Sequence, residues 1–72
     1  MSIVRYGIVI ETGLANCSAY VPDLPGCIAT GSTVAEVKKR MRAAIRIHLE
    51  GLREDGDSPP VPTTVCDWVE VA

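Results

Sequence analysis

The chain has 72 residues, of which 47% are hydrophobic and 22% charged, and its formal net charge is −2. This length allows one domain with a thin core, and the apolar fraction excludes an intrinsically disordered chain. The near-neutral charge argues against a non-specific coat for nucleic acid, and no apolar run approaches the ~20 residues of a membrane span. We therefore expect one domain over residues 1–72, located in the cytoplasm, and its small core favours a homo-oligomer.

Four strands and one helix are predicted in the order β-β-β-α-β, which is the α+β class. Residues 3–10 alternate β-branched side chains, and residues 17–21, 27–30 and 65–71 also have strand character. The short connections between the first three strands predict an antiparallel meander with the helix packed on the sheet. A reversal near Leu24 places Cys17 opposite Gly31 and away from Cys27, which argues against a disulfide between these two thiols.

The longest predicted element is a helix that begins after Thr33 and ends near Glu54. Thr33 and Glu36 have the spacing of a capping box, and Gly56 with the prolines beyond it stops the helix. Ile47 points away from the apolar face, so we expect a lone exposed residue or part of an association surface. At helical spacing, the apolar face that would pack on the sheet contains Val34, Val37, Met41, Ala44, Ile45, His48 and Leu52.

Basic side chains form a stripe beside this apolar face. One interpretation is a surface for RNA phosphates or an acidic partner. The other is a solvated helix face, supported by two pairs four residues apart, Glu36–Arg40 and Arg46–Glu50. No aromatic residues alternate with the basic ones, so base stacking has little support. The residues of the stripe are Lys39, Arg42, Arg46 and Arg53.

No catalytic motif occurs in the sequence. There is no phosphate-binding loop, no zinc-ligand spacing and no nucleophile elbow. His48 is the only histidine, and the three widely spaced cysteines are expected to be buried apolar residues. A metal-dependent nuclease would need carboxylates such as Glu11 and Asp67 to converge, which nothing in the sequence specifies. We expect no metal and no cofactor.

Two segments resemble the HicB-like antitoxin family: residues 18–31, which contain the letters YVPDLPGC, and residues 48–56, HLEGLREDG. The resemblance implies a degenerate ribonuclease-H-like fold and the role of a non-catalytic antitoxin. It also implies a partner, a small HicA-like toxin that cleaves RNA. Full-length members add a C-terminal DNA-binding segment, whereas this sequence stops after its last predicted strand. We therefore expect no DNA-binding domain and no direct DNA binding.

An inhibitor of this kind would cover the active surface of the toxin, and acidic groups would complement a basic toxin. Trp68 is a candidate anchor, because aromatic residues concentrate binding energy at interfaces. Two alternatives stay open: an RNA-binding accessory protein that uses the basic stripe, and a residual metal-dependent ribonuclease-H-like nuclease. The candidate partner-binding residues are Asp23, Glu50, Glu54, Asp55, Asp57 and Trp68.

Overall fold

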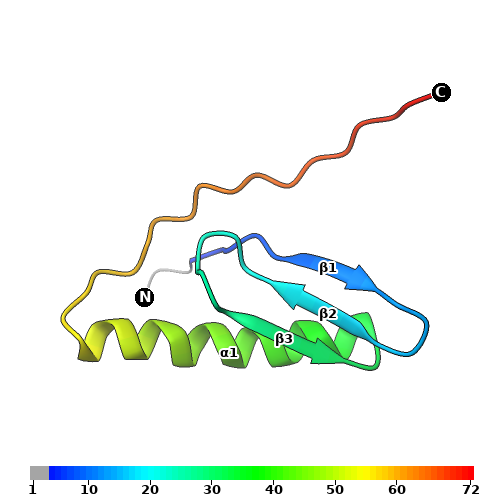
Figure 1. Ribbon diagram of the computed structural model, residues 1–72. Helices are drawn as coiled ribbons and strands as arrows, with labels where there is room; N and C mark the ends of the chain where they lie inside the picture. Colours follow the sequence, from blue (N-terminus) through cyan, green and yellow to red (C-terminus); the bar gives the residue numbers. More distant parts are fainter. Residues whose placement is uncertain (1–3) are drawn as a thin grey trace.

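Three short strands and one long helix follow one another along the chain (Figure 1). The computed structural model describes residues 4–72. The elements are β1 Val9–Thr12, β2 Cys17–Tyr20, β3 Ile28–Gly31 and α1 Val34–Glu54. The strands form an antiparallel sheet in the order β1-β2-β3, and α1 packs on one face of it. The predicted α+β class and the antiparallel meander are therefore confirmed.

The turn between β2 and β3 sets the register of the sheet. Cys17 lies opposite Gly31, as predicted, and neither Cys17 nor Cys27 is in a disulfide. The N–H of Cys27 donates to the Leu24 carbonyl at 3.1 Å. Gly26 has φ of +82°, a conformation that costs glycine nothing. The turn thereby brings Leu24 inward, where its side chain is completely buried.

Both predicted ends of α1 are confirmed. The Thr33 hydroxyl accepts a hydrogen bond from the Glu36 N–H at 3.1 Å, which satisfies a free amide of the first turn. The Glu36 carboxylate accepts from the Ser32 N–H at 3.0 Å, one residue before the cap. At the other end the N–H of Asp55 donates to a helical carbonyl, and Gly56 leaves the helix with φ of +79°.

The core lies between α1, the sheet and the β2–β3 turn. Tyr6, Ile8 and Ile10 pack against it, whereas Val4, which continues the same alternation, is 55% exposed. Leu49 also packs there although the predicted helix face omitted it, whereas Val34 is 44% exposed. The buried hydrophobic residues are Cys17, Ala19, Val21, Leu24, Cys27, Val37 and Met41.

The predicted boundaries of all three observed strands need correction. β2 ends at Tyr20, one residue before the predicted end. The other two strands differ more. β1 begins at Val9, while residues 4–8 of the predicted strand are unpaired and residue 3 lies outside the described residues. β3 is displaced by one residue, to Ile28–Gly31, because Cys27 closes the preceding turn. In both cases the side-chain pattern located the segment, and the hydrogen bonds of its neighbours decided where pairing starts.

The predicted fourth strand is absent from the structure. Residues 57–72 contain no helix or strand, and Figure 1 shows them as an extended segment that runs past β1 and away from the sheet. Val65 is 84% exposed and Val71 is 89% exposed. The observed order is therefore β-β-β-α instead of β-β-β-α-β. The relationship to the ribonuclease-H-like fold stays a prediction.

The first half of this segment is attached to the body by polar contacts. The Tyr6 hydroxyl donates to the Pro60 carbonyl at 2.6 Å. The Asp23 carboxylate accepts from the N–H groups of Thr63 and Thr64 at 3.2 and 3.1 Å. The segment leaves the body beyond these contacts, and we call residues 65–71 the tail.

Candidate functional site

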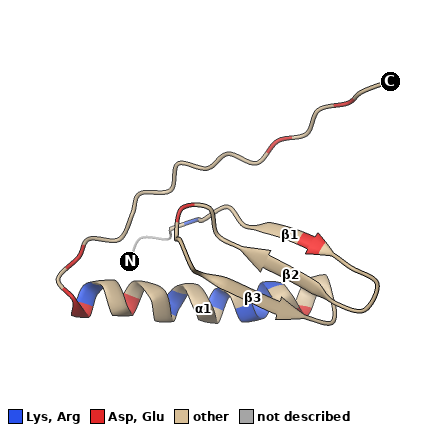
Figure 2. Ribbon diagram, viewed as in Figure 1, with Lys and Arg blue, Asp and Glu red and all other residues tan. Residues whose placement is uncertain are grey.

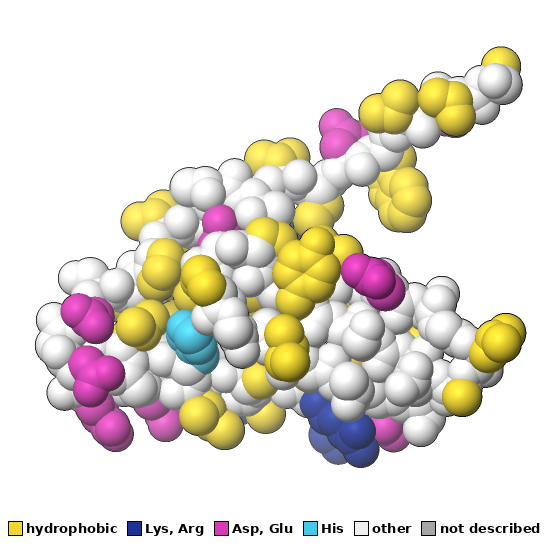
Figure 3. Space-filling model, viewed as in Figure 1, with side chains coloured by type: hydrophobic (Ala, Val, Ile, Leu, Met, Phe, Trp, Pro, Cys, Tyr) yellow, Lys and Arg dark blue, Asp and Glu magenta, His cyan; other side chains and the backbone are white. Residues whose placement is uncertain are grey.

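Four carboxylates gather at the C-terminal end of α1 (Figure 2), and all of them are exposed. Figure 3 shows a group of acidic side chains at the same end of the molecule. The C-terminal end of a helix carries partial negative charge, so an exposed carboxylate in the last turn, such as that of Glu54, costs about 0.3–1 kcal/mol. Folding stability therefore does not account for this arrangement, which suits a positively charged partner. The four residues, here the helix-end acids, are Glu50, Glu54, Asp55 and Asp57.

Asp23 was predicted to contact a partner together with these acids, but its carboxylate is engaged within the chain. Besides the two N–H groups, the Thr63 hydroxyl donates to it at 2.9 Å. Desolvation raises the pKa of Asp23, but the hydrogen bonds from Thr64 and Thr63 lower it by more, so the carboxyl titrates below its ordinary value. In this structure Asp23 holds residues 63 and 64 in place.

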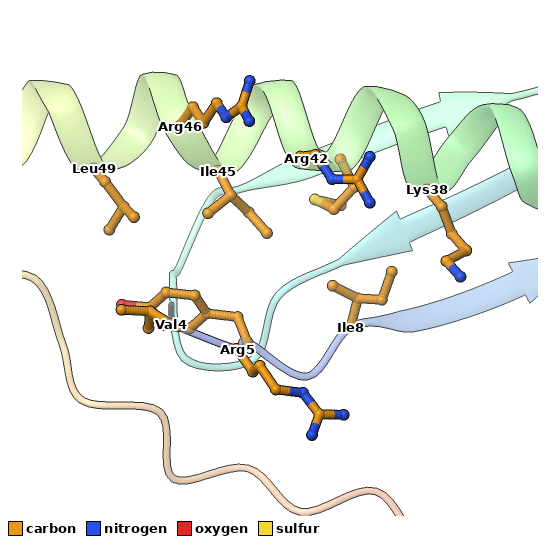
Figure 4. A pocket seen from close by; sticks show the side chains of 10 residues that line it. Val4, Arg5, Ile8, Lys38, Arg42, Ile45, Arg46 and Leu49 are labelled. Carbon is orange, nitrogen blue, oxygen red and sulfur yellow. The ribbon is translucent and has the colours of Figure 1, made fainter. Parts of the chain in front are cut away.

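The predicted basic stripe divides into two parts in the structure. Arg42 and Arg46 line an open groove of about 710 Å³ between α1 and residues 4–8, whereas Lys39 and Arg53 do not (Figure 4). The floor of the groove is apolar. We call this feature the basic groove; its basic residues are Arg5, Lys38, Arg42 and Arg46, and its apolar residues include Tyr6, Ile8, Met41, Ile45 and Leu49.

Sequence reasoning missed two of these cations. Lys38 stands four residues before Arg42 and eight before Arg46, so the row was present in the helical spacing. Arg5 comes from a separate segment that the fold brings opposite the helix, and no local pattern indicates that placement.

Arg40 links α1 to β3 through its side chain. Its guanidinium donates to the Thr30 carbonyl of β3 at 3.0 Å and lies 3.2 Å from the Glu36 carboxylate. The predicted Glu36–Arg40 pair is thus confirmed, and it is the one ion pair found in residues 4–72. The predicted Arg46–Glu50 pair is not formed in the structure.

Ile47 is 70% exposed, as its position on the helix predicted. It lines a shallow depression of about 270 Å³ together with His48 and with Ile28, which is 68% exposed. Figure 3 shows His48 among hydrophobic side chains on this face. His48 is half-buried, in agreement with its predicted place on the apolar face of the helix. A role of Ile47 in association stays a prediction.

The cysteines differ in exposure. Cys17 and Cys27 are buried as predicted, and burial raises the pKa of the Cys27 thiol. Cys66 is exposed, which corrects the prediction for this residue, because the strand that would have covered it is not formed. Within the described part of the chain, no three His, Cys, Asp or Glu side chains stand close enough together to hold a metal ion.

Trp68 lies on the tail and is 94% exposed, separate from the helix-end acids. The backbone N–H of Trp68 donates to the Asp67 carboxylate at 2.7 Å. The structure therefore does not combine all six predicted partner-binding residues into one surface. Four stand at the helix end, Asp23 binds the chain itself, and Trp68 projects from the tail.

These features define a small α+β protein whose charged surfaces suit the binding of other molecules. Residues 6–71 match the family described as HicB_like antitoxin of bacterial toxin-antitoxin system. The chain therefore belongs to the HicB-like antitoxin family, which confirms the resemblance seen in the sequence.

A curated relative comes from Haemophilus phage HP1 (strain HP1c1), where it is described as an uncharacterized 14.9 kDa protein in the rep-hol intergenic region. It is 38% identical over 64 residues, which are 89% of this chain and 48% of that protein. The chain thus spans about half the length of this relative. Of the helical residues that the structure describes, no stretch is both long and apolar enough to cross a membrane.

Proposed function

We propose that this chain is an antitoxin that neutralises a small, basic, RNA-cleaving toxin of the HicA-like kind by covering its active surface. The match of residues 6–71 to the antitoxin family carries this proposal. The mechanism requires no catalytic group in the antitoxin, because steric exclusion of RNA from the toxin is sufficient. The proposal places the chain in the cytoplasm, where such a toxin meets RNA.

The helix-end acids support a basic partner. They are exposed and of one sign, and Glu50 and Glu54 are held by α1 itself while Asp55 and Asp57 follow directly after it, so they can form charge pairs with a basic partner. An interface of ordinary size takes about 800 Å² from each partner. The chain exposes 5957 Å², so such an interface would occupy a limited part of its surface.

The experiment is an RNA-cleavage assay with a purified small, basic HicA-like toxin, titrated with the purified chain. We expect cleavage to stop at a stoichiometric amount of antitoxin. A variant with Glu50→Gln, Glu54→Gln, Asp55→Asn and Asp57→Asn should associate at least about tenfold more slowly at low salt, because these charges attract the toxin. Glu11→Gln, an exposed change on β1, serves as the control and should inhibit like the parent chain.

Two results would contradict the proposal in different ways. Full RNA cleavage at a large excess of the chain would reject neutralisation of this toxin. Full inhibition with unchanged association kinetics in the fourfold variant would retain the antitoxin role but reject the helix-end acids as its contact surface.

A further inference from the structure

The tail and the basic groove are both without a partner in the structure. Trp68 and Val69 are 94% and 87% exposed, although apolar side chains of this size are normally covered. The four cations of the basic groove take no part in the ion pair described above. The family match extends to residue 71, so the tail lies within the matched region.

The two features are complementary in charge and in chemistry. The tail combines three valines and Trp68 with the carboxylates of Asp67 and Glu70. The basic groove combines an apolar floor with four cationic side chains, and Figure 4 shows Lys38, Arg42 and Arg46 along one side of it. In an extended segment the three valines share one face with Asp67, and Trp68 and Glu70 share the other, so each face combines apolar and acidic side chains. Both faces therefore match a groove whose lining is apolar and basic.

The lengths also agree. From Lys38 to Leu49 the helix rises about 16 Å, at 1.5 Å per residue. Six extended residues, 66–71, span about 16 Å, in five steps of about 3.3 Å each. The charged part of the tail therefore fits along the helical wall of the groove.

The tail of the same copy is poorly placed to enter the groove. Thr63 and Thr64 are bound to Asp23, and Thr64 and Cys66 lie beside Gly7. In Figure 4, residues 4–8 stand between this segment and the helical wall of the groove. To reach its own groove, the tail would have to cross residues 4–8 or lose the hydrogen bonds to Asp23.

We propose that the tail of one copy docks in the basic groove of a second copy, and that the exchange is reciprocal. Each groove of such a dimer covers one tail, which buries Trp68 and the valines and pairs Asp67 and Glu70 with the groove cations. Reciprocal exchange closes the assembly at two copies. This inference is independent of the proposed toxin, because it uses none of the helix-end acids.

The test uses two charge-reversed chains. One carries Asp67→Lys and Glu70→Lys in the tail, and the other carries Arg42→Glu and Arg46→Glu in the groove. In each variant alone, the tail and the reversed or unchanged groove arginines carry charges of the same sign, so self-association should weaken at least about tenfold. In an equimolar mixture every tail finds a groove of opposite charge, so dimers should return. Folding of one chain upon itself cannot produce such rescue by mixing.

The readouts are molar mass by light scattering and the emission of Trp68, the only tryptophan. The parent chain should have twice the mass of one copy, and Trp68 emission should shift to longer wavelength on dilution. Lys39→Glu with Arg53→Glu is the matched control: it changes the net charge equally on α1 but lies outside the groove, and it should stay dimeric.

Several results would overturn the proposal. A parent chain that is monomeric with a buried Trp68 at every concentration would show that the tail folds onto its own copy. Dimers that persist in both charge-reversed variants, or a mixture that stays monomeric, would reject the tail and the basic groove as the dimer interface. A monomeric parent chain that binds single-stranded RNA, with binding lost on Arg42→Glu and Arg46→Glu, would assign the groove to RNA instead.

Discussion

Replacement of Leu24 by alanine should remove a large part of the stability of this protein. The side chain is 0% exposed and sits at the junction of the β2–β3 turn, the sheet and α1. Truncation of a buried leucine costs about 3 kcal/mol in free energy of unfolding, from lost burial and the remaining cavity. A domain of this size has about 4–10 kcal/mol in total, so the loss is a substantial fraction.

The assay is urea unfolding followed by far-ultraviolet circular dichroism, because the exposed Trp68 does not report on the core of a single copy. With a slope of about 1–1.5 kcal/mol per molar urea, the midpoint should fall by about 2–3 M. Leu14→Ala is the matched control: this leucine is fully exposed in the β1–β2 turn, and its loss should change stability by less than about 0.5 kcal/mol. Equal midpoints for the two variants would refute the assignment of Leu24 to the core.

Three further predictions concern single positions. Gly31→Ala should lower the free energy of unfolding by about 1–3 kcal/mol in the same assay, because a Cβ there would lie 3.0 Å from the Val37 backbone nitrogen. Unchanged stability would show that α1 can shift away from β3. Since the folded pKa of Asp23 is lowered, its hydrogen bonds contribute fully above the ordinary value of 3.8 and are lost as pH falls through the lowered value. Nuclear magnetic resonance should then show the two threonine amides moving below pH 3.8 in the parent chain, and Asp23→Asn should abolish that transition. A thiol reagent should label Cys66 in the native chain and the two buried cysteines only on unfolding, as read by mass spectrometry.

The local signals of the sequence located most of the fold. The helix boundaries depend on Thr33, Glu36 and Gly56, which act on residues within one turn of themselves. The register of β2 and β3 depends on a short turn rich in proline and glycine, where few geometries are possible. Helix caps and short turns can be predicted from one sequence because the residues that interact in them are close together along the chain.

The remaining features depend on partners far apart in the chain. The alternation in residues 65–71 describes a segment suited to a strand, but it contains no information about which edge the segment would join. Asp23 is engaged by threonines 40 and 41 residues later, and no local pattern indicates this. The basic groove likewise needs Arg5 opposite α1, so a helical projection found only part of it.

The order of the elements has a consequence for the folding of the chain. Each strand pairs with its neighbour in sequence, and Arg40 joins α1 to β3 across ten residues. Pairing between neighbours in sequence lowers the contact order relative to a sheet of distant strands, and a lower contact order favours faster folding. During synthesis the residues from β1 to the end of α1 are available before the tail is complete. The body of each copy can therefore fold first. The tail would dock afterwards, on a body that is already folded.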